Sequence, residues 1–450
     1  MGKPTDIRIV ELQCDATESP FRTPLKFGGN VVTHSMNFKV TARVQTRDGR
    51  EATGIGWMPQ GSVWGFPSAE VTRQEANESG MELYHRAARA AAEYDGFAHP
   101  VDIALELEPV WLKQAAEISA EMKLGAPIPK LYALVCTSPI DAALHDAYGK
   151  ALGLNVYNAY GPEHMNRDLA AYLTPAFAGE YLDRYTSRAP KEWMPLYHLV
   201  GALDPLTPAD VEKPIGDGLP EHLIEWIVFD NLTHLKIKLN GDDVVWDAER
   251  VAAVERAAAE GMARRGCDQW VYSLDFNEKC RNVEYIIEFL RRAEELAPTA
   301  FARVAYIEQP TARDLRAHPE NKMHRAAAIK PVVIDESLTD LESYELAKQQ
   351  GYSGVALKTC KGQSHALLMG AMAQKDNLFL CVQDLTCPGD AFLHSAGLAA
   401  RMPSITAIEG NARQFCPISN VEAAQAYPEI FKPTDGQIRT GLLTQPGLGH

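Results

Sequence analysis

Apolar residues follow two different periods along this chain. In the first part, IRIVELQ and MNFKVTARVQTRDG alternate in the manner of antiparallel strands, and the turn residues RDG lead into a third run, EATGIGWM. Apolar spacings of three and four residues follow in MELYHRAARAAAEYDG and VWLKQAAEISAEMKLG, as in helices. The first 155 residues therefore predict an α+β domain.

The segment TSPIDAALHDAYGKALGLN predicts a third helix in this domain. Ser138 suits the N-cap, Pro139 suits the first helical position, and Asp141 completes an arrangement like a capping box. Gly153 can close the C-terminus. One face of this helix carries an apolar stripe of Ile140, Ala143, Leu144, Ala147, Tyr148 and Ala151.

From about residue 168 short apolar runs alternate with helical segments. The runs are AAYL or YHLVGAL, then HLKIKL, WVYSLDF, RVAYIE, PVVID, GVALK, LFLCVQ and ITAIEG. Eight βα units with right-handed crossovers close into an α/β barrel. We interpret 176–220 as an insertion or an elaborated loop. The predicted division is an α+β domain over 1–155, a barrel over 156–411 and a C-terminal segment, 412–450, that completes the first domain.

Composition narrows the possible partners. Hydrophobic residues make up 46% and charged residues 23%, which is typical of a soluble globular enzyme. The net charge of -15, without a basic stripe, argues against a nucleic-acid partner. The sequence contains no run of about twenty apolar residues, which is the length that a membrane-spanning helix requires, so it predicts no membrane span. The eight cysteines are scattered without a CxxC pair, so we expect reduced thiols in a cytoplasmic protein.

Three acidic residues end three successive apolar runs: Asp275 in VYSLDFNE, Glu308 in RVAYIEQP and Asp335 in KPVVIDES. One βα unit separates each from the next, so the three carboxylates should meet at the mouth of the barrel. Carboxylates gathered in this way repel one another, and a hard divalent cation with oxygen ligands relieves that repulsion. The pattern therefore predicts a metal site, for which Mg²⁺ fits best.

Lysines precede and follow these acids. Lys236 and Lys238 are separated by one residue, so on a strand both point into the barrel mouth. Lys358 ends a later run and would face them across the metal, although Lys361 is an alternative inward residue. A lysine whose pKa is lowered by desolvation and neighbouring positive charge can remove the proton α to a carboxylate.

Taken together, these motifs resemble the enolase superfamily, in particular its muconate-lactonizing-enzyme-like and mandelate-racemase-like members. The segment IDAALHDAYGKALGLNVYNAYG is similar to that family's link between capping domain and barrel, and FRTPLKFGG resembles its mobile cap loop. The resemblance implies a homo-oligomer that uses Mg²⁺. It also implies site roles: metal ligands Asp275, Glu308 and Asp335, a base Lys238 on one face, an acid or base Lys358 on the other, and Lys236 at the substrate carboxylate.

Further side chains are candidates for contact with the substrate. They lie in two loops of the capping domain or at the rim of the barrel: Arg22, Phe27, Trp57, Asn277, Gln383, Asp384 and Glu409.

The predicted function is Mg²⁺-dependent abstraction of the proton α to the carboxylate of a small molecule, giving an enediolate. With lysines on both faces, the simplest outcome is racemisation or epimerisation. An acid-sugar dehydratase, or another β-eliminating lyase, is an alternative with the same first step. A Schiff-base aldolase using Lys238 or Lys358, or a barrel without catalysis, represents a different class.

Overall fold

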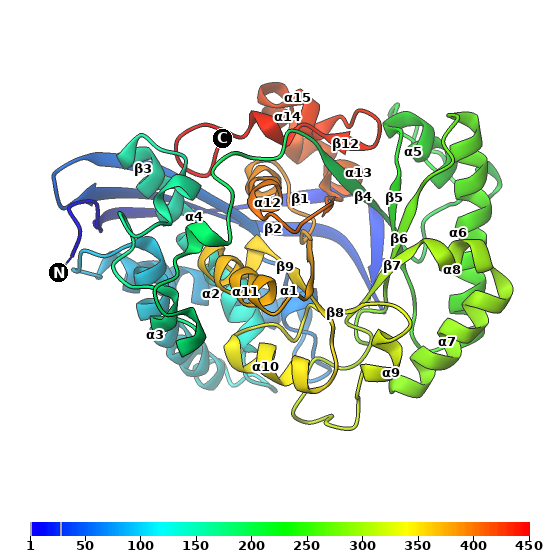
Figure 1. The fold of residues 1–450 in the computed structure, drawn as a ribbon, viewed down its shortest axis with the longest axis horizontal. Coiled ribbons are helices and arrows are strands. Elements are labelled where there is room, and N and C mark those ends of the chain that lie inside the picture. The colour runs from blue at the N-terminus through cyan, green and yellow to red at the C-terminus, as the bar shows by residue number, and fades with distance from the viewer. Residues whose placement is uncertain (1, 28) are drawn as a thin grey trace.

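The computed structural model describes residues 2–27 and 29–450. Its first domain contains a three-stranded antiparallel sheet in the order β1-β2-β3, formed by β1 (Ile7–Phe27), β2 (Asn30–Thr46) and β3 (Glu51–Pro59). The predicted meander is confirmed, but β1 and β2 are longer than the alternating pattern indicated. Their far ends extend from the sheet across the barrel (Figure 1). The hairpin thus carries cap residues to the barrel mouth.

Four helices complete this domain: α1 (Ser62–Gly65), α2 (Arg73–Ala92), α3 (Pro100–Glu121) and α4 (Lys130–Leu152). The predicted start of the last helix is wrong, because Ser138 and Pro139 lie inside α4. The preceding residues, LYALVC, are buried, and their packing favours helix despite the internal proline. Gly153, at φ 66°, closes α4 as predicted.

The second domain is a closed barrel of eight parallel strands, as predicted. They are β4 (Met194–Val200), β5 (His234–Lys238), β6 (Val271–Asp275), β7 (Val304–Glu308), β8 (Val332–Ile334), β9 (Gly354–Leu357), β10 (Phe379–Val382) and β11 (Ile408–Glu409). Pairing of β11 with β4 closes the ring. The first strand is YHLVGAL rather than AAYL, so the barrel begins inside the span interpreted as an insertion.

Helices cover the outside of the barrel (Figure 1). They are α5 (Leu223–Asp230), α6 (Val244–Arg264), α7 (Val283–Leu296), α8 (Pro298–Arg303), α9 (His324–Ala327), α10 (Leu341–Gln349), α11 (Gln363–Lys375) and α12 (Asp390–Arg401). Their apolar stripes are buried, as in α6 with Val251, Val254 and Met262. Short 3-10 turns lie between the larger elements: η1 (Val156–Ala159), η2 (Leu169–Ala171), η3 (Pro175–Phe177), η4 (Leu182–Arg184), η5 (Pro208–Asp210) and η6 (Thr359–Lys361).

The C-terminal segment contacts both domains. It comprises α13 (Ala412–Phe415), η7 (Pro417–Asn420), α14 (Val421–Ala426), α15 (Pro428–Phe431), β12 (Gln437–Ile438) and η8 (Thr440–Leu442). Strand β12 pairs with β4 of the barrel, whereas the amide of Leu448 donates to Asp146 of α4 at 3.0 Å. The boundaries at 155 and 411 stay predictions. None of the described helices combines the length and the apolar character that a membrane span requires. All eight cysteines are free thiols.

A buried polar cluster joins α4 to α11 and α12. Asp141 accepts hydrogen bonds from the amide and hydroxyl of Ser364, both at 2.8 Å, and His145 Nε2 lies 2.9 Å from the same hydroxyl. The contacts continue through Tyr160 and Gln363 to His394, whose Nε2 lies 2.8 Å from Gln363 Oε1. We call these six residues the seam cluster: Asp141, His145, Tyr160, Gln363, Ser364 and His394.

Candidate active site at the mouth of the barrel

The predicted acids and lysines converge at the carboxyl ends of the barrel strands. In strand register, Lys238 lies beside Asp275, and Asp275 lies beside Glu308. Asp335 follows the last residue of β8, and Lys358 follows the last residue of β9. All of these side chains are buried. Because consecutive strands end at one rim, residues up to 120 positions apart in the chain meet in one place.

Lys236 occupies the centre of this cluster. Its Nζ lies 3.0 Å from Asp275 Oδ2, 2.8 Å from Glu308 Oε2 and 2.7 Å from Glu409 Oε2. Lys238 points the same way from β5, forms an ion pair with Asp275 and donates to Asn277 Oδ1 at 3.0 Å. The strand alternation thus places both ammonium groups inside the barrel, as predicted.

Two lysines flank Asp335 from the other side. Lys358 Nζ lies 2.9 Å from Asp335 Oδ2. Lys361 Nζ donates to the backbone carbonyls of Asp335 and Leu338, at 2.5 and 3.2 Å, and lies 3.2 Å from Asp335 Oδ1. Lys361 therefore holds the loop that carries Asp335, whereas Lys358 is the lysine that lines the cavity described below.

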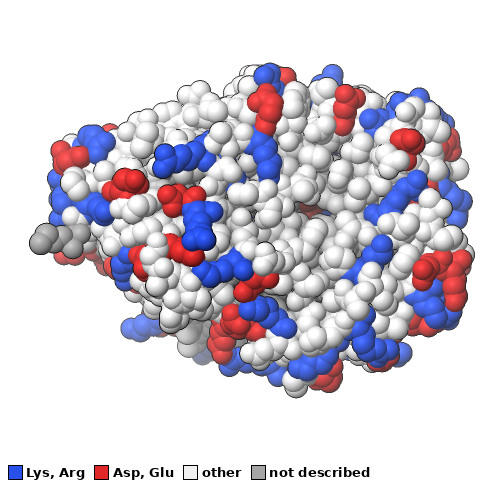
Figure 2. Space-filling model, in the orientation of Figure 1, with Lys and Arg blue, Asp and Glu red and all other residues white. Residues whose placement is uncertain are grey.

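Negative charge exceeds positive charge in this buried cluster. Six carboxyl groups, of Asp275, Glu308, Asp335, Glu336, Asp384 and Glu409, face four lysines, Lys236, Lys238, Lys358 and Lys361. Burial, followed by the charge of Asp275, raises the pKa of Glu308 well above its usual value. Burial also raises the pKa of Glu336 and of Asp384 to about 7, with Asp335 and Glu409 respectively adding to the shift. On the face in Figure 2, by contrast, basic and acidic side chains are interspersed.

The expected lowering of the lysine pKa is not what the structure shows. Burial, the largest single influence, lowers the pKa of Lys358, but the charges of Asp335, Glu308 and Glu409 together outweigh it and raise the pKa. The pKa of Lys236 is likewise raised, by Asp275, Glu308 and Glu409 against the effect of burial. The prediction considered desolvation and the neighbouring lysines, but it left out the attraction of the carboxylates, which outnumber the lysines here.

The donor chemistry suits a divalent cation. Six buried carboxyl groups against four ammonium groups leave two negative charges uncompensated when all are ionised, and one Mg²⁺ would balance them. Glu336 Oε2, also buried here, accepts no hydrogen bond. Across residues 2–27 and 29–450, however, no three acidic, histidine or cysteine side chains converge on one point. Asp275, Glu308 and Asp335 turn toward lysines instead, so shared binding of one ion requires rotation of these side chains.

A small cavity of about 40 Å³ opens onto this cluster. Both Lys238 and Lys358 line it, and the capping domain contributes Leu25, Phe27 and Trp64. The indole Nε1 of Trp64 donates to Glu336 Oε1 at 2.9 Å, and its ring lies 4.7 Å from Lys358 Nζ. The cap therefore completes the wall of the cavity.

The structure brings four of the seven candidate substrate contacts to this cavity: Phe27, Asn277, Asp384 and Glu409. Gln383 lies beneath it, with its amide donating to Glu308. Arg22 lies elsewhere, because its guanidinium pairs with Asp217 at 2.6 Å in the loop after β4. Trp57 packs against Gly389 instead.

Sequence reasoning did not select Leu25, Leu199 and Leu385, which also line the cavity. Apolar residues in loops carry no chemical signature, and only their place in the cap loops and strand ends could have marked them. Trp64, by contrast, is a candidate from the sequence, since it lies in an aromatic-rich stretch, GSVWGFP, of the capping domain.

Comparison with known proteins identifies the family and the fold. The family model for the enolase C-terminal domain-like group matches residues 221–450, just over half of the chain. No curated protein sequence matches. Among solved structures, muconate lactonizing enzyme from Pseudomonas fluorescens, complexed with muconolactone, is similar over 98% of this chain and 96% of its own, with 18% identity and a TM-score of 0.60.

Two further structures share the fold. A dipeptide epimerase from Enterococcus faecalis V583, complexed with Mg and the dipeptide L-Leu-L-Tyr, is similar over 98% of this chain and 99% of its own, with 17% identity and a TM-score of 0.63. An enolase from Bradyrhizobium, complexed with magnesium and mandelic acid, covers 99% and 95%, with 15% identity and a TM-score of 0.60. By the extent of the family match, together with a capped barrel of this architecture, the chain belongs to the enolase superfamily.

Proposed function

We propose that this protein is an enzyme that removes the proton α to the carboxylate of a small molecule and returns a proton to the opposite face. Racemisation or epimerisation is the result. The observation that carries the proposal is the position of Lys238 and Lys358. Strands β5 and β9 are four places apart in a ring of eight, so the two amines approach one cavity from opposite sides.

Asp275, Glu308 and Asp335 are the proposed ligands of Mg²⁺. The excess of carboxyl groups over lysines in the active-site cluster supports this assignment. The magnesium in the structures of the Enterococcus epimerase and the Bradyrhizobium protein supports it as well. A bound Mg²⁺ would hold the substrate carboxylate and stabilise the charge that develops when the α-proton leaves.

The remaining side chains position the reacting groups. Asn277 accepts a hydrogen bond from Lys238 and so fixes the direction of its amine. Lys236 lies deeper than Lys238 and is bonded to three carboxylates, which suits it to binding negative charge rather than to proton transfer. Leu25, Phe27 and Trp64 cover the cavity and exclude water, which strengthens the electrostatic interactions within it.

Isotope exchange in deuterated water tests this proposal. With Mg²⁺ and separate enantiomers of α-substituted carboxylic acids, the wild-type protein should incorporate deuterium at the α-carbon of both enantiomers, as followed by NMR. Lys238→Met and Lys358→Met should each retain exchange with one enantiomer only, and with opposite preference, because each lysine serves one face. Equal loss with both enantiomers in both variants, or exchange that continues in chelator, would contradict it.

A further inference from the structure

The catalytic cavity is too small for a whole substrate. Its volume of about 40 Å³ compares with the ~10–15 Å³ that a single water molecule requires by the same kind of measure. It can therefore take little more than a carboxylate and its α-carbon. The rest of any substrate must lie in a neighbouring space.

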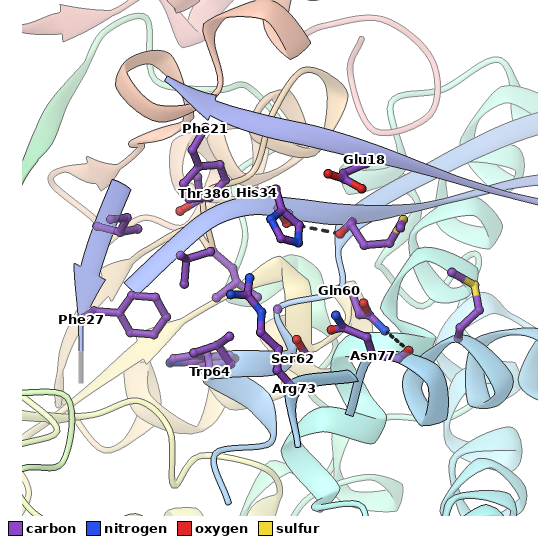
Figure 3. Close-up of a pocket in the computed structure, with 18 of the residues that line it drawn as sticks. Glu18, Phe21, Phe27, His34, Gln60, Ser62, Trp64, Arg73, Asn77 and Thr386 are labelled. Atoms are coloured by element: carbon purple, nitrogen blue, oxygen red, sulfur yellow. Dashed lines mark hydrogen bonds between the residues drawn. The ribbon is translucent and has the colours of Figure 1, made fainter. Parts of the chain in front are cut away.

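A second cavity, which we call the cap cavity, provides that space. It measures about 430 Å³ and lies between the ends of β1 and β2, helix α1, the start of α2 and the loop after β10 (Figure 3). Five residues line both cavities: Leu25, Phe27, Trp64, Leu385 and Thr386. The two spaces are thus adjacent, and their combined size is within the ~300–1,000 Å³ usual for small-molecule sites.

The inner wall of the cap cavity is apolar. Leu25, Val32 and Trp64 are buried there, and Phe21, Phe27 and Met81 are half-buried. Figure 3 shows Phe21, Phe27 and Trp64 around one side of the space.

Several polar groups of this cavity are paired or lie at its rim, although His34, Ser62, Asn77 and Thr386 also line it. Gln60 donates to the carbonyl of Asn77 at 2.8 Å, and the carboxylate of Glu82 pairs with Arg86 at 2.6 Å. Glu18, Arg73 and Glu78 line the space but are exposed to solvent. A chain of hydroxyl groups placed against Leu25, Val32 and Met81 would lose its bonds to water without finding partners on that part of the wall.

From this adjacency and this lining we infer that the substrate is a carboxylic acid whose α-carbon carries a bulky apolar group, aryl or branched alkyl, that fills the cap cavity. A polyhydroxylated acid does not fit this wall, and the inference therefore separates this protein from the acid-sugar dehydratases. It rests on the proposed function, because the carboxylate must be held at the lysine and acid cluster.

Two acids with the same number of non-hydrogen atoms provide the test: 2-hydroxy-4-phenylbutanoate and gluconate. Calorimetry with the Mg²⁺-loaded protein should show binding of the phenyl acid at least about tenfold tighter than gluconate, since burial of a phenyl group favours binding strongly. Equal or tighter binding of gluconate would overturn the inference, as would binding of neither acid.

A matched pair of variants on one strand locates the effect. Val32 is 8% exposed and lines the cap cavity, whereas its neighbour Val31 is 48% exposed and does not. Val32→Asn should remove most of the preference for the phenyl acid, and Val31→Asn should keep it. Met81→Gln, on α2, should repeat the loss without altering the hairpin. An unchanged preference in both Val32→Asn and Met81→Gln would overturn the inference.

Asp275→Asn distinguishes this inference from the proposed function. If both hold, Asp275→Asn or removal of Mg²⁺ weakens both acids, whereas the cap variants weaken only the phenyl acid. If the phenyl acid binds equally well without Mg²⁺ and in Asp275→Asn, yet still responds to Val32→Asn, the proposed function is wrong while the apolar character of the cap cavity stands.

Discussion

The active-site cluster and the seam cluster are both buried and polar, but their bonding differs. In the active-site cluster, charged groups predominate, and the buried atoms Glu336 Oε2 and Gln383 Oε1 accept no hydrogen bond. In the seam cluster, none of the six described residues leaves a buried side-chain nitrogen or oxygen without a partner.

This difference in bonding fits two different roles, which are to join helices in the seam cluster and to bind a ligand in the active-site cluster. A fully paired buried network fixes one arrangement of the elements that it joins, and the seam cluster fixes α4 against α11 and α12. Incomplete pairing costs stability but keeps acceptors ready for a ligand. The active-site cluster should therefore respond to ligands and to Mg²⁺, whereas the seam cluster should respond only to conditions that unfold the protein.

The largest expected effect follows from removal of the central cation. Lys236→Met leaves Asp275, Glu308 and Glu409 without their shared partner, and loss of one member of a buried ion pair costs about 3–5 kcal/mol. We expect a decrease of that size in the free energy of unfolding in urea, in the absence of Mg²⁺.

Lys348→Met is the control for that variant. Lys348 pairs with Asp376 at 2.6 Å near the surface, with side chains 33% and 29% exposed, so its loss should cost less than about 1 kcal/mol. Equal stability of the two variants would show that Lys236 does not hold the active-site cluster together.

The next largest effect concerns Mg²⁺. A ligand at 100 times its dissociation constant stabilises the folded state by about 2.7 kcal/mol. We expect added Mg²⁺ to raise the unfolding midpoint of the wild-type protein and of Ser364→Ala, a seam variant, by the same amount. Asp335→Asn should abolish the rise. A full response in Asp335→Asn would place the ion elsewhere.

Acid should weaken the seam cluster. Burial, with the charges of His450 and His145, lowers the pKa of His394 to about 3 from 6.5. Between pH 6.5 and about 3 the unfolded chain therefore binds a proton at His394 that the folded chain does not bind. The contribution of His394 to the free energy of unfolding is fully present above pH 6.5 and decreases as the pH falls toward 3. One such histidine contributes about 1.4 kcal/mol per pH unit in that window.

His394→Gln should reduce the pH dependence of the unfolding free energy by about that slope between pH 6.5 and 4, which urea titrations at several pH values would measure. His318→Gln, at an exposed position beside Glu320, should leave the slope unchanged. An unaltered slope in His394→Gln would contradict the lowered pKa.

The contrast between the clusters also shows what the sequence can reveal. The acids and lysines were predictable because each stands at the end of an apolar run, and strand ends of a barrel meet in space. The seam cluster was not, because Asp141 and Ser364 are 223 residues apart and no local pattern joins them. For the same reason Asp141 was interpreted as part of a helix cap, although tertiary packing makes α4 begin earlier, at Lys130. The pairing of Arg22 with Asp217, in the loop after β4, could not be predicted from the sequence either.

The smallest expected effect tests the link between the cap and the active-site cluster. The Trp64 indole donates a hydrogen bond to Glu336 Oε1, and this oxygen also accepts one from the Asn277 amide at 3.3 Å. Asn277 in turn accepts a hydrogen bond from Lys238. Trp64→Phe keeps the ring beside Lys358 but removes this donor, at a cost of about 1 kcal/mol, or roughly fivefold in the rate of α-proton exchange. The decrease should appear in kcat, because the altered bond positions the base rather than the substrate.

Trp193→Phe, at a position 37% exposed, should leave the rate unchanged. A decrease confined to KM, or equal in the two variants, would show that the indole shapes the cavity without orienting the lysine.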